Sequence, residues 1–442
     1  MNKNRRYGPL FTDLYEITMA ASYQANRFDS EATFSLFVRN YPPQRNFLVA
    51  AGLEDALSQL EQFHFAEDEI QYLEKTGRFS DDFLAYLQHI RFSGQVYAVP
   101  EGTIFFPGEP ILEVTAPLIE AQLLETFLLN TLGFSSLIAS KAARCKIAAD
   151  GRALIDFSLR RTQGLDAGLH VARSMYLAGF SATSNVLAGK IHDIPVSGTM
   201  AHSYVTAFNS EVEAFSAYAQ QFPDQAVFLI DTFDTLQGAR HAAEVARRMQ
   251  KRGHSLIGVR LDSGDMTALS KEVRRILDEA GLSQVKVFAS GGFDEYKIAA
   301  ALSGGACIDA FGVGTKVGVS DDAPYMDIVY KMVQFNDRNV RKLSPGKATL
   351  AGRKQVFRRM DPEGFFQEDV IALRHEEIQG AAPLLEKVMD GGKCLKPHPS
   401  LQAIREKFNR EISCLPKEIQ SISKHKIYPV HLSRRLQKAQ ED

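Results

Sequence analysis

One stretch decides the fold of this chain: Val259-Arg260-Leu261-Asp262-Ser263-Gly264-Asp265. An apolar segment, Ser255 to Val259, precedes it and predicts a strand that ends here. Apolar residues spaced by three and four follow from Met266 to Ala280 and predict a helix. A short turn of this kind needs only a helix cap and a glycine, so the additional polar groups indicate a functional site. A capping aspartate beside a solvated arginine would give the same pattern.

The same pattern of strand, turn and helix recurs along the centre of the chain. The apolar runs that predict strands are Ala153 to Phe157, Pro195 to Ser197, Ala226 to Ile230, Ser255 to Leu261, Val285 to Ala289 and Ile308 to Phe311. Strands and helices that alternate at this pitch predict parallel strands joined by right-handed crossovers. An open doubly wound sheet and a barrel both satisfy this pattern.

The placement of polar residues favours the barrel. A polar cluster follows every predicted strand, namely Arg160-Arg161, Gly198 to Ser203, Asp231 to Thr235, Arg260 to Asp265, Ser290 to Glu295 and Gly312 to Thr315. In a (β/α) barrel all of these turns lie on the face that carries activity, whereas an open sheet gathers only those beside its switch point. We therefore predict an α/β fold whose centre is an irregular (β/α) barrel of parallel strands.

The segments on either side of the barrel have different patterns. Residues 1–118 predict an α+β N-terminal domain, with Thr12 capping its first helix, a strand from Ala32 to Val38, helices over 48–63 and 68–87, and a small antiparallel element over 95–117. The barrel is predicted over 119–322. Residues 323–442 predict a β-rich and helical C-terminal segment that packs back on the N-terminal domain, with a helical tail from Leu384.

The composition excludes several classes of protein. A net charge of -2 argues against a general nucleic-acid or membrane-surface binder. The basic N-terminus (Lys3, Arg5, Arg6) lacks the apolar core of a signal peptide, and Leu118 to Ile138 is interrupted by charges, as in a core helix. The four cysteines are scattered, which predicts reduced thiols in a cytoplasmic protein and no structural zinc.

Two glycine-rich turns close successive late strands of the predicted barrel. They are Ser290-Gly291-Gly292 and Gly312-Val313-Gly314-Thr315. Glycine lets backbone N–H groups approach an anion, and the helix that follows adds the positive end of its dipole. Phosphate sites recur at the late strands of such barrels, although tight turns also need glycine. The tandem arrangement therefore predicts a phosphate site.

Carboxylates, an imidazole and an aromatic ring accompany these turns. Five aspartates are expected around the same mouth: Asp231, Asp234, Asp262, Asp265 and Asp294. They could stabilise a cationic carbon or hold Mg²⁺ through a phosphorylated substrate, or serve as helix caps. His202 could be a general base, a ligand contact or a nucleophile, and Phe157 with Arg160 and Arg161 suits a planar anion. No cluster of histidines and cysteines has transition-metal spacing, so no tightly held metal is predicted.

These residues resemble the nicotinate phosphoribosyltransferase family. The segments that carry the resemblance include Thr12 to Met19, Phe37-Val38-Arg39, Leu159 to Gly164, Thr183 to Gly189, Gly198 to Ser203, Asp231 to Asp234, Arg260 to Asp265, Ser290 to Asp294, Phe311 to Thr315 and Lys342 to Lys347. They keep the family's order over about three-quarters of the chain. The resemblance implies ATP-assisted transfer of phosphoribosyl from phosphoribosyl pyrophosphate (PRPP) to nicotinate, giving nicotinate mononucleotide and pyrophosphate for NAD synthesis.

The resemblance also implies roles for individual residues. His202 would be the histidine that ATP phosphorylates, Asp262 and Asp231 would face the ribose, and Mg²⁺ would be held mainly through substrate phosphates. Nicotinate would be bound by Phe157, Ser184, Thr199, Arg260 and the partner subunit's Tyr15. The phosphate ligands would be Arg39, Arg160, Gly291, Gly292, Gly312, Gly314 and Thr315, with Arg39 reaching across a homodimer. Asp265 would have only a helix-capping role.

Three other functions compete with this interpretation. Nicotinamide-using relatives carry an aspartate where this chain has Ser184, and a carboxylate there would repel nicotinate, so serine favours the acid. Quinolinate phosphoribosyltransferase would release CO₂ without ATP. A non-catalytic pyridine-nucleotide sensor could use the basic segment from Arg341 to Arg359.

Overall fold

The computed structural model describes residues 7–344, 347 and 349–441. Lys3, Arg5 and Arg6, together with Pro345 and Gly346 of the Lys342 to Lys347 motif, lie outside these residues. The chain forms two compact units. Unit 1 contains residues 1–140 and 325–442, and unit 2 contains residues 141–324. The predicted boundaries at residues 118 and 322 remain a proposal.

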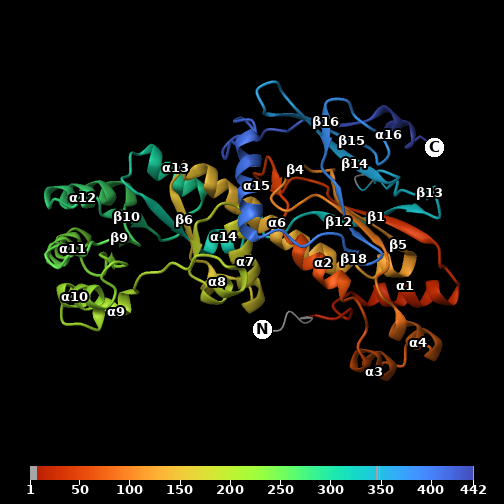
Figure 1. Cartoon of the computed structure of the whole chain (residues 1–442), viewed down its shortest axis with the longest axis horizontal. Coiled ribbons are helices and arrows are strands. Elements are labelled where there is room, and N and C mark those ends of the chain that lie inside the picture. Colours follow the sequence, from red (N-terminus) through yellow and green to blue (C-terminus); the bar gives the residue numbers. More distant parts are fainter. Residues whose placement is uncertain (1–6, 345–346, 348, 442) are drawn as a thin grey trace. The chain divides into compact units, whose positions relative to one another are not determined.

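Unit 2 is built on a parallel sheet, drawn in green and yellow-green in Figure 1. Its strands are β6 (Ala153–Asp156), β7 (Ala182–Thr183), β8 (Val227–Leu229), β9 (Gly258–Leu261), β10 (Lys286–Ala289) and β11 (Ala310–Val313). Their order is β7-β6-β11-β10-β9-β8, and every pairing is parallel. Val196 extends the order through a parallel bridge to Thr183. The strands therefore follow one another as around a barrel, and within the described residues the ladder is open between Val196 and β8.

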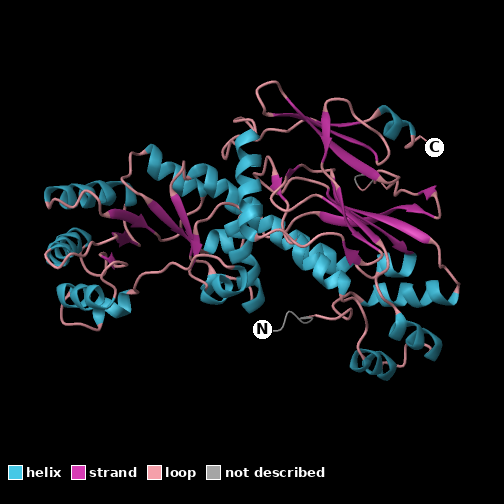
Figure 2. Ribbon diagram, viewed as in Figure 1, coloured by secondary structure: helices cyan, strands magenta, loops and turns pink. Residues whose placement is uncertain are grey.

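Helices alternate with these strands, as the sequence pattern predicts. They are η1 (Leu159–Arg161), α7 (Leu165–Leu177), α8 (Val186–His192), α9 (His202–Thr206), α10 (Glu211–Gln221), α11 (Thr235–Gln250), α12 (Met266–Glu279), α13 (Glu295–Ser303) and α14 (Thr315–Gly318). Figures 1 and 2 show α10, α11 and α12 along the outer side of the sheet, where α11 packs on both neighbours. The prediction of an α/β fold with an irregular barrel of parallel strands is confirmed, in the form of a curled half-barrel sheet. The two-residue strand β7 was missed because its apolar run is too short to show periodicity. The strand predicted from Pro195 to Ser197 was wrong, since only Val196 forms an isolated bridge there.

The turn that follows β9 ends in the predicted helix cap. Asp265 caps α12 by accepting hydrogen bonds from the amides of Thr267 and Ala268, at 3.0 and 3.1 Å. Asp234 and Asp294 cap α11 and α13 in the same way. Three of the five predicted aspartates therefore satisfy helix N-termini, which leaves Asp231 and Asp262 available for chemistry.

Unit 1 contains a seven-stranded antiparallel sheet and two smaller sheets. The order of the large sheet is β13-β12-β1-β5-β3-β17-β18. Its strands are β1 (Glu31–Val38), β3 (Gln95–Ala98), β5 (Pro110–Pro117), β12 (Ile328–Phe335), β13 (Arg338–Asn339), β17 (Glu386–Asp390) and β18 (Lys393–Cys394). The small sheets join β2 (Leu48–Val49) to β4 (Ile104–Phe105), and β16 (Ala381–Pro383), β14 (Lys354–Met360), β15 (Phe366–Leu373) and β19 (Val430–Leu432) in that order. Strands from both ends of the chain thus share one sheet.

The helices of unit 1 surround these sheets. They are α1 (Leu14–Ala25), α2 (Leu53–Glu61), α3 (Glu67–Lys75), α4 (Asp81–His89), α5 (Leu118–Gln122), α6 (Glu125–Ala148, shared with unit 2), α15 (Leu401–Cys414) and α16 (Arg434–Lys438). The stretch from Leu118 to Ala148 is long and apolar enough to span a membrane, but 61% of its apolar window is buried inside the fold. Such burial is typical of a core helix, which agrees with the sequence prediction.

Three local predictions for unit 1 were wrong. Asp13, not Thr12, occupies the N-cap position of α1. The helix predicted from residue 48 begins only at Leu53, because Leu48 and Val49 pair with β4 and Gly52 turns the chain at φ 92°. The tail after Leu384 is not wholly helical, since β17 and β18 complete the large sheet. In the last two cases a long-range pairing or a turn outweighed the local helical pattern.

A buried carboxylate links the two ends of the chain within unit 1. Glu113 on β5 is fully buried and lies 3.2 Å from the ammonium group of Lys354 on β14. It also pairs with Arg374 and accepts a hydrogen bond from Ser35. Burial alone would raise the pKa of Glu113, but Lys354 and Arg374 outweigh it and lower the pKa. The ionised group therefore stabilises the packing of residues 353–374 on the N-terminal strands.

Candidate active site

A cavity of about 320 Å³ lies within unit 2, beside the open edge of the parallel ladder. Its walls include Phe157, Thr199, Arg260 and Gly312 from the carboxyl ends of the strands. Gln225 and Ile257 line it at the amino ends of β8 and β9. The volume falls in the range of small-ligand pockets, about 300–1,000 Å³.

Arg260 is the charged side chain of this cavity. Its Nη1 donates a hydrogen bond to Thr199 Oγ1 at 2.5 Å, and its guanidinium carbon lies 5.9 Å from the centre of the Phe157 ring. The Nε is buried and has no hydrogen-bond partner among the described residues. Burial lowers the pKa of Arg260, although Asp262 and Asp231 oppose this effect. A desolvated guanidinium with an unused donor is suited to a carboxylate, which would accept two parallel hydrogen bonds.

The Phe157 ring forms an apolar wall because its neighbours leave space for it. A Cβ atom on Gly312 would lie 2.5 Å from the ring, so only glycine fits beneath it. Asp156, the residue before Phe157, is 1% exposed. Its carboxylate accepts hydrogen bonds from Ser158 N, Ser158 Oγ and Thr183 Oγ1 at 2.8, 2.6 and 2.7 Å. Burial raises the pKa of Asp156, while these hydrogen bonds lower it. Asp156 thus fixes the segment that presents Phe157, a role that no sequence pattern indicated.

Asp231, Asp262 and His202 meet at the mouth of the sheet. Asp231 Oδ2 accepts hydrogen bonds from the Asp262 amide at 3.0 Å and from Ser263 Oγ at 2.6 Å. Asp231 Oδ1 is buried without a hydrogen-bond partner among the described residues. Asp262 Oδ1 accepts from Ser290 Oγ at 2.5 Å, and Asp262 Oδ2 lies 4.0 Å from His202 Nε2. Two carboxylates and an imidazole predicted from separate turns therefore form one cluster.

His202 is oriented by a neighbouring hydroxyl. Its Nδ1 lies 3.2 Å from Thr232 Oγ1, and 45% of its side chain is exposed. If the Nδ1 carries the proton, the Nε2 lone pair is free and points toward the Asp262 side of the site. An exposed and oriented imidazole of this kind can act as a nucleophile or a proton acceptor.

The two glycine-rich turns are linked by an ion pair. Gly291 and Gly292 have φ of 97° and 69°, which place them in the left-handed region that favours glycine. Asp294 follows the first turn and Lys316 follows the second. The Lys316 Nζ lies 2.6 Å from Asp294 Oδ2. Lys297 Nζ donates to the Gly291 carbonyl at 2.5 Å. The turns thus form a cationic rim that is suited to phosphate groups.

A fully buried charge cluster supports this rim from within unit 2. Glu295, the first residue of α13, has no exposed surface and lies 2.7 Å from both Lys141 Nζ and Arg144 Nε. Lys141 also lies 3.0 Å from Asp322, which follows the second glycine-rich turn. Removing one member of such a cluster would leave a buried charge without its partner, so the cluster fixes the start of α13. The members of the cluster are far apart in the chain, so no local sequence pattern indicates it.

The resemblance implies that the Gly291 turn binds PRPP, so we expect Gly291→Ala to raise the KM for PRPP. The new Cβ would lie 2.0 Å from the Asp262 carbonyl oxygen, so the turn must move. An L-residue in left-handed backbone costs about 1–2 kcal/mol of folding stability. Separately, displacement of the turn should raise the KM about tenfold, equivalent to about 1.4 kcal/mol of binding free energy. Steady-state kinetics with varied PRPP would measure it.

Gly253→Ala is the matched control for that substitution. Gly253 has a similar φ of 82°, but a Cβ there would meet nothing within 4 Å. It should lower the midpoint of thermal unfolding slightly and leave the KM for PRPP unchanged. An equal change of the KM in both variants would contradict a role for the Gly291 turn.

The other predicted binding residues do not line this cavity. Ser184 is half-buried, Arg160 and Thr315 are exposed, and Gly314 packs against the Phe157 carbonyl. Tyr15 and Arg39 belong to unit 1. Arg39 lines a separate cavity of about 300 Å³ with Asn40 and Lys354, and its guanidinium lies 3.7 Å from Asp327. Among the residues described, no group of three or more histidine, cysteine, aspartate or glutamate side chains is placed to hold a metal.

Tyr15 lies on an exposed apolar surface of α1. Its side chain is 49% exposed, and Phe11, Leu14 and Met19 nearby are 39%, 50% and 38% exposed. Behind it, Glu16 is fully buried, and burial raises the pKa of Glu16 to about 7. Partial burial, together with Glu16, also raises the pKa of the Tyr15 phenol, so its hydroxyl stays protonated at neutral pH.

Comparison with known proteins accounts for almost the whole chain. The model of the nicotinate phosphoribosyltransferase (NAPRTase) family matches residues 152–363, and the models of its N-terminal and C-terminal domains match residues 10–133 and 379–440. A nicotinate phosphoribosyltransferase of Mycobacterium tuberculosis is 47% identical, over 97% of this chain and 92% of the relative. That of Bacillus subtilis is 40% identical, over 96% and 92%.

Solved structures give the same result for the fold. The crystal structure of human nicotinic acid phosphoribosyltransferase superposes with a TM-score of 0.87 at 30% identity, covering 97% of this chain and 99% of the human one. A nicotinate-nucleotide pyrophosphorylase from Pyrococcus furiosus superposes with a TM-score of 0.75 at 26% identity, covering 91% and 96%.

Proposed function

The chain belongs to the nicotinate phosphoribosyltransferase family, and we propose that nicotinate binds in the unit 2 cavity through Arg260. The enzyme transfers the phosphoribosyl group of PRPP to nicotinate and releases pyrophosphate. The observation that supports the proposed site most directly is the half-buried Arg260 side chain, which donates to Thr199 and whose buried Nε has no hydrogen-bond partner among the described residues. The pyridine ring would lie against Phe157 and the carboxylate against Arg260 and Thr199.

The carboxylates beside the cavity suit the chemistry of the transfer. When the bond from the anomeric carbon to pyrophosphate breaks, positive charge develops on the ribose and negative charge on the leaving oxygens. Asp262, fixed by Ser290, and Asp231 would stabilise the ribose. The pyridine nitrogen then supplies the electron pair for the new bond, and a stacked ring is already positioned for that attack. Gly291, Gly292, Gly314 and Thr315 would bind the phosphates through their backbone amides.

The donor set at the mouth also fits Mg²⁺. Carboxylate oxygens are the ligands that this cation prefers, and the buried Oδ1 of Asp231 has no hydrogen-bond partner among the described residues. Asp231 and Asp262 would therefore hold the ion together with the substrate phosphates. When bound, Mg²⁺ would neutralise charge on the leaving pyrophosphate.

ATP would act through His202. The His202 Nε2 lone pair would attack the γ-phosphorus, the bond to the bridging oxygen would break, and ADP would leave with its electrons. The Nδ1 proton would remain on the ring, donated to Thr232. The phosphoryl group would place negative charge beside Asp262, and its repulsion would favour a rearranged rim that lysines and arginines can stabilise.

A product assay tests the function and its competitors together. We expect nicotinate mononucleotide from nicotinate and PRPP, at a rate that ATP raises, and little product from nicotinamide. Preference for nicotinamide, or ATP-independent CO₂ release from quinolinate, would replace the proposal with one of those two reactions. Tight nucleotide binding without pyrophosphate release would instead indicate a sensor.

A homodimer with shared sites would give Tyr15 and Arg39 their roles. The exposed apolar side chains on α1 support this proposal, because a contiguous apolar surface is typical of an interface. Tyr15 of the partner subunit would cover the open side of the nicotinate ring, and Arg39 would bind a phosphate. All four cysteines are free thiols, which supports a cytoplasmic location.

We expect mixed variants to complement one another. Tyr15→Ala and Arg260→Ala chains should each be weakly active, but a mixed dimer has one site with both residues intact. Random exchange should restore about a quarter of the wild-type rate, since about half of the dimers are mixed and each has one intact site. Rates after subunit exchange, verified by native mass spectrometry, measure this recovery. Exchange without recovered activity would exclude a shared site.

A further inference from the structure

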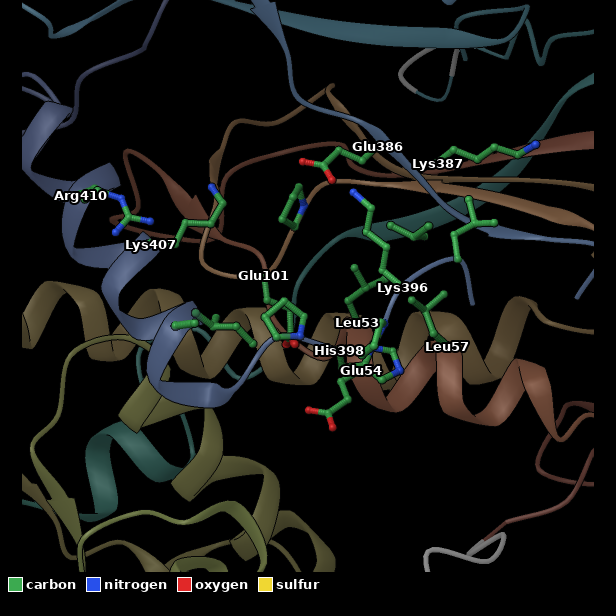
Figure 3. Close-up of a pocket in the computed structure, with 17 residues that line it drawn as sticks. Leu53, Glu54, Leu57, Glu101, Glu386, Lys387, Lys396, His398, Lys407 and Arg410 are labelled. Carbon is green, nitrogen blue, oxygen red and sulfur yellow. The ribbon is translucent and has the colours of Figure 1, made fainter. Parts of the chain in front are cut away.

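Unit 1 contains a cavity of about 300 Å³ that the proposed reaction does not use (Figure 3). It lies between α2, the turn after β3, strand β17, the segment Leu395–Pro399 and helix α15. These segments are more than 300 residues apart at their extremes, so the cavity exists only in the folded chain. Its volume is at the lower end of the range for small-ligand pockets, about 300–1,000 Å³.

The base of this cavity is apolar and rigid. Leu57 on α2 and Ile404 on α15 are 3% and 4% exposed, so they belong to the core and cannot move aside. The proline rings of Pro100, Pro397 and Pro399 add flat apolar surfaces. A flat aromatic body fits such a base better than a flexible polar chain does. The rigid ligand buries apolar area, and neither the ligand nor the cavity side chains lose much conformational entropy on binding.

The rim of the cavity carries cations that the fold does not neutralise. Figure 3 shows Lys407 and Arg410 on the same helix, with Lys396 entering from the neighbouring segment. Lys407 is paired with Glu411 at 3.0 Å. Within the described part of the chain, neither Lys396 nor Arg410 forms an ion pair, and both are exposed. Two long cationic side chains are therefore available to a ligand.

Three carboxylates also line the cavity: Glu54 in the first turn of α2, Glu101 and Glu386. Glu101 is 6% exposed, and its Oε1 accepts a hydrogen bond from the Gly52 amide at 2.6 Å. It is therefore committed to the start of α2, whose N-terminus favours a negative charge. Glu386 is exposed on the rim and could accept a hydrogen bond from an N–H of the ligand.

We propose that this cavity is a second binding site, for a small amphipathic anion with a flat aromatic body and one anionic group. The body would lie on Leu57, Ile404 and the prolines, and the anionic group would meet Arg410, which Figure 3 shows beside Lys407 and apart from Lys396. A carboxylate, phosphate or sulfonate would satisfy the same side chains, because each is a compact anion that accepts several hydrogen bonds. The proposal does not depend on the chemistry assigned to unit 2.

Fluorescence titration with anilinonaphthalene sulfonate tests the site, since this probe has an aromatic body and one sulfonate. The full-length wild-type chain should bind one probe, and saturating nicotinate and PRPP should not displace it. Ala403→Trp would fill the cavity and should abolish the fluorescence gain. Arg410→Glu should weaken binding about tenfold or more, equivalent to at least about 1.4 kcal/mol.

Lys393→Glu is the control, because Lys393 is exposed but does not line the cavity. It should bind the probe as the wild type does. Arg410→Glu changes only an exposed side chain, so it remains informative if Ala403→Trp does not fold. Absence of probe binding, displacement by the substrates, or equal affinity in the Arg410 and Lys393 variants would overturn the proposal.

Discussion

Replacing Arg260 by alanine should lower kcat/KM for nicotinate about 100- to 1,000-fold, because losing one partner of a buried, hydrogen-bonded charge pair costs about 2–5 kcal/mol. The guanidinium lies near the Phe157 ring and donates a hydrogen bond to Thr199, and its loss would remove both contacts. Arg260→Lys should retain part of the activity, since an ammonium group keeps the charge but cannot present two parallel N–H donors. Steady-state kinetics with varied nicotinate would measure both changes.

Two comparisons make this prediction specific to the carboxylate. Turnover of nicotinamide, which carries no charge, should change much less in Arg260→Ala than turnover of nicotinate. Arg248→Ala removes an exposed arginine on α11 and should leave both rates unchanged. If Arg260→Ala stays within about threefold of the wild type, less than about 1 kcal/mol, nicotinate does not bind through this residue.

The second large effect is expected at His202. His202→Ala should remove the stimulation by ATP completely while leaving the slower ATP-independent transfer in place. Without the imidazole there is no nitrogen to accept the phosphoryl group, whereas Arg260, Phe157 and Asp262 remain. Initial rates with and without ATP, and transfer of a radiolabelled γ-phosphate to the chain, measure the two halves of this prediction.

His254→Ala is a suitable control for His202→Ala. Both imidazoles are partly exposed and make one polar contact through Nδ1, His254 with Asp224 at 3.1 Å and His202 with Thr232 at 3.2 Å. Each substitution should therefore cost about 1 kcal/mol of stability or less. ATP stimulation that persists in His202→Ala, or label that remains on the chain, would exclude His202 as the phosphoryl acceptor.

Much of unit 2 could be predicted from local sequence. Apolar runs from Ala153 to Phe311 marked five of the six strands of the parallel sheet, all except β7, and the polar turn after each marked the edge where the site lies. Asp265 was predicted to be a helix cap, and it is one. These predictions succeeded because periodicity, helix caps and the identity of the residue after a strand are local properties.

The support of the site could not be predicted in this way. Asp156 fixes Phe157 through Ser158 and Thr183, and Glu295 is held by Lys141 and Arg144 from α6. Nothing in a short window of sequence distinguishes these residues from ordinary surface charges. Their roles depend on burial, which is set by segments that lie from about 25 to 150 residues away.

The sequence by itself therefore determined the parallel α/β unit, the edge that carries the polar turns and the position of Arg260 and Asp262 at a strand end. Only the tertiary structure decided which groups Arg260 meets, how Gly312 makes room for Phe157, and how strands from both ends of the chain form one sheet. The physical reason is the range of the interactions. Hydrogen bonds within a turn or helix are fixed by neighbouring residues, whereas packing and charge burial depend on segments brought together by the whole fold.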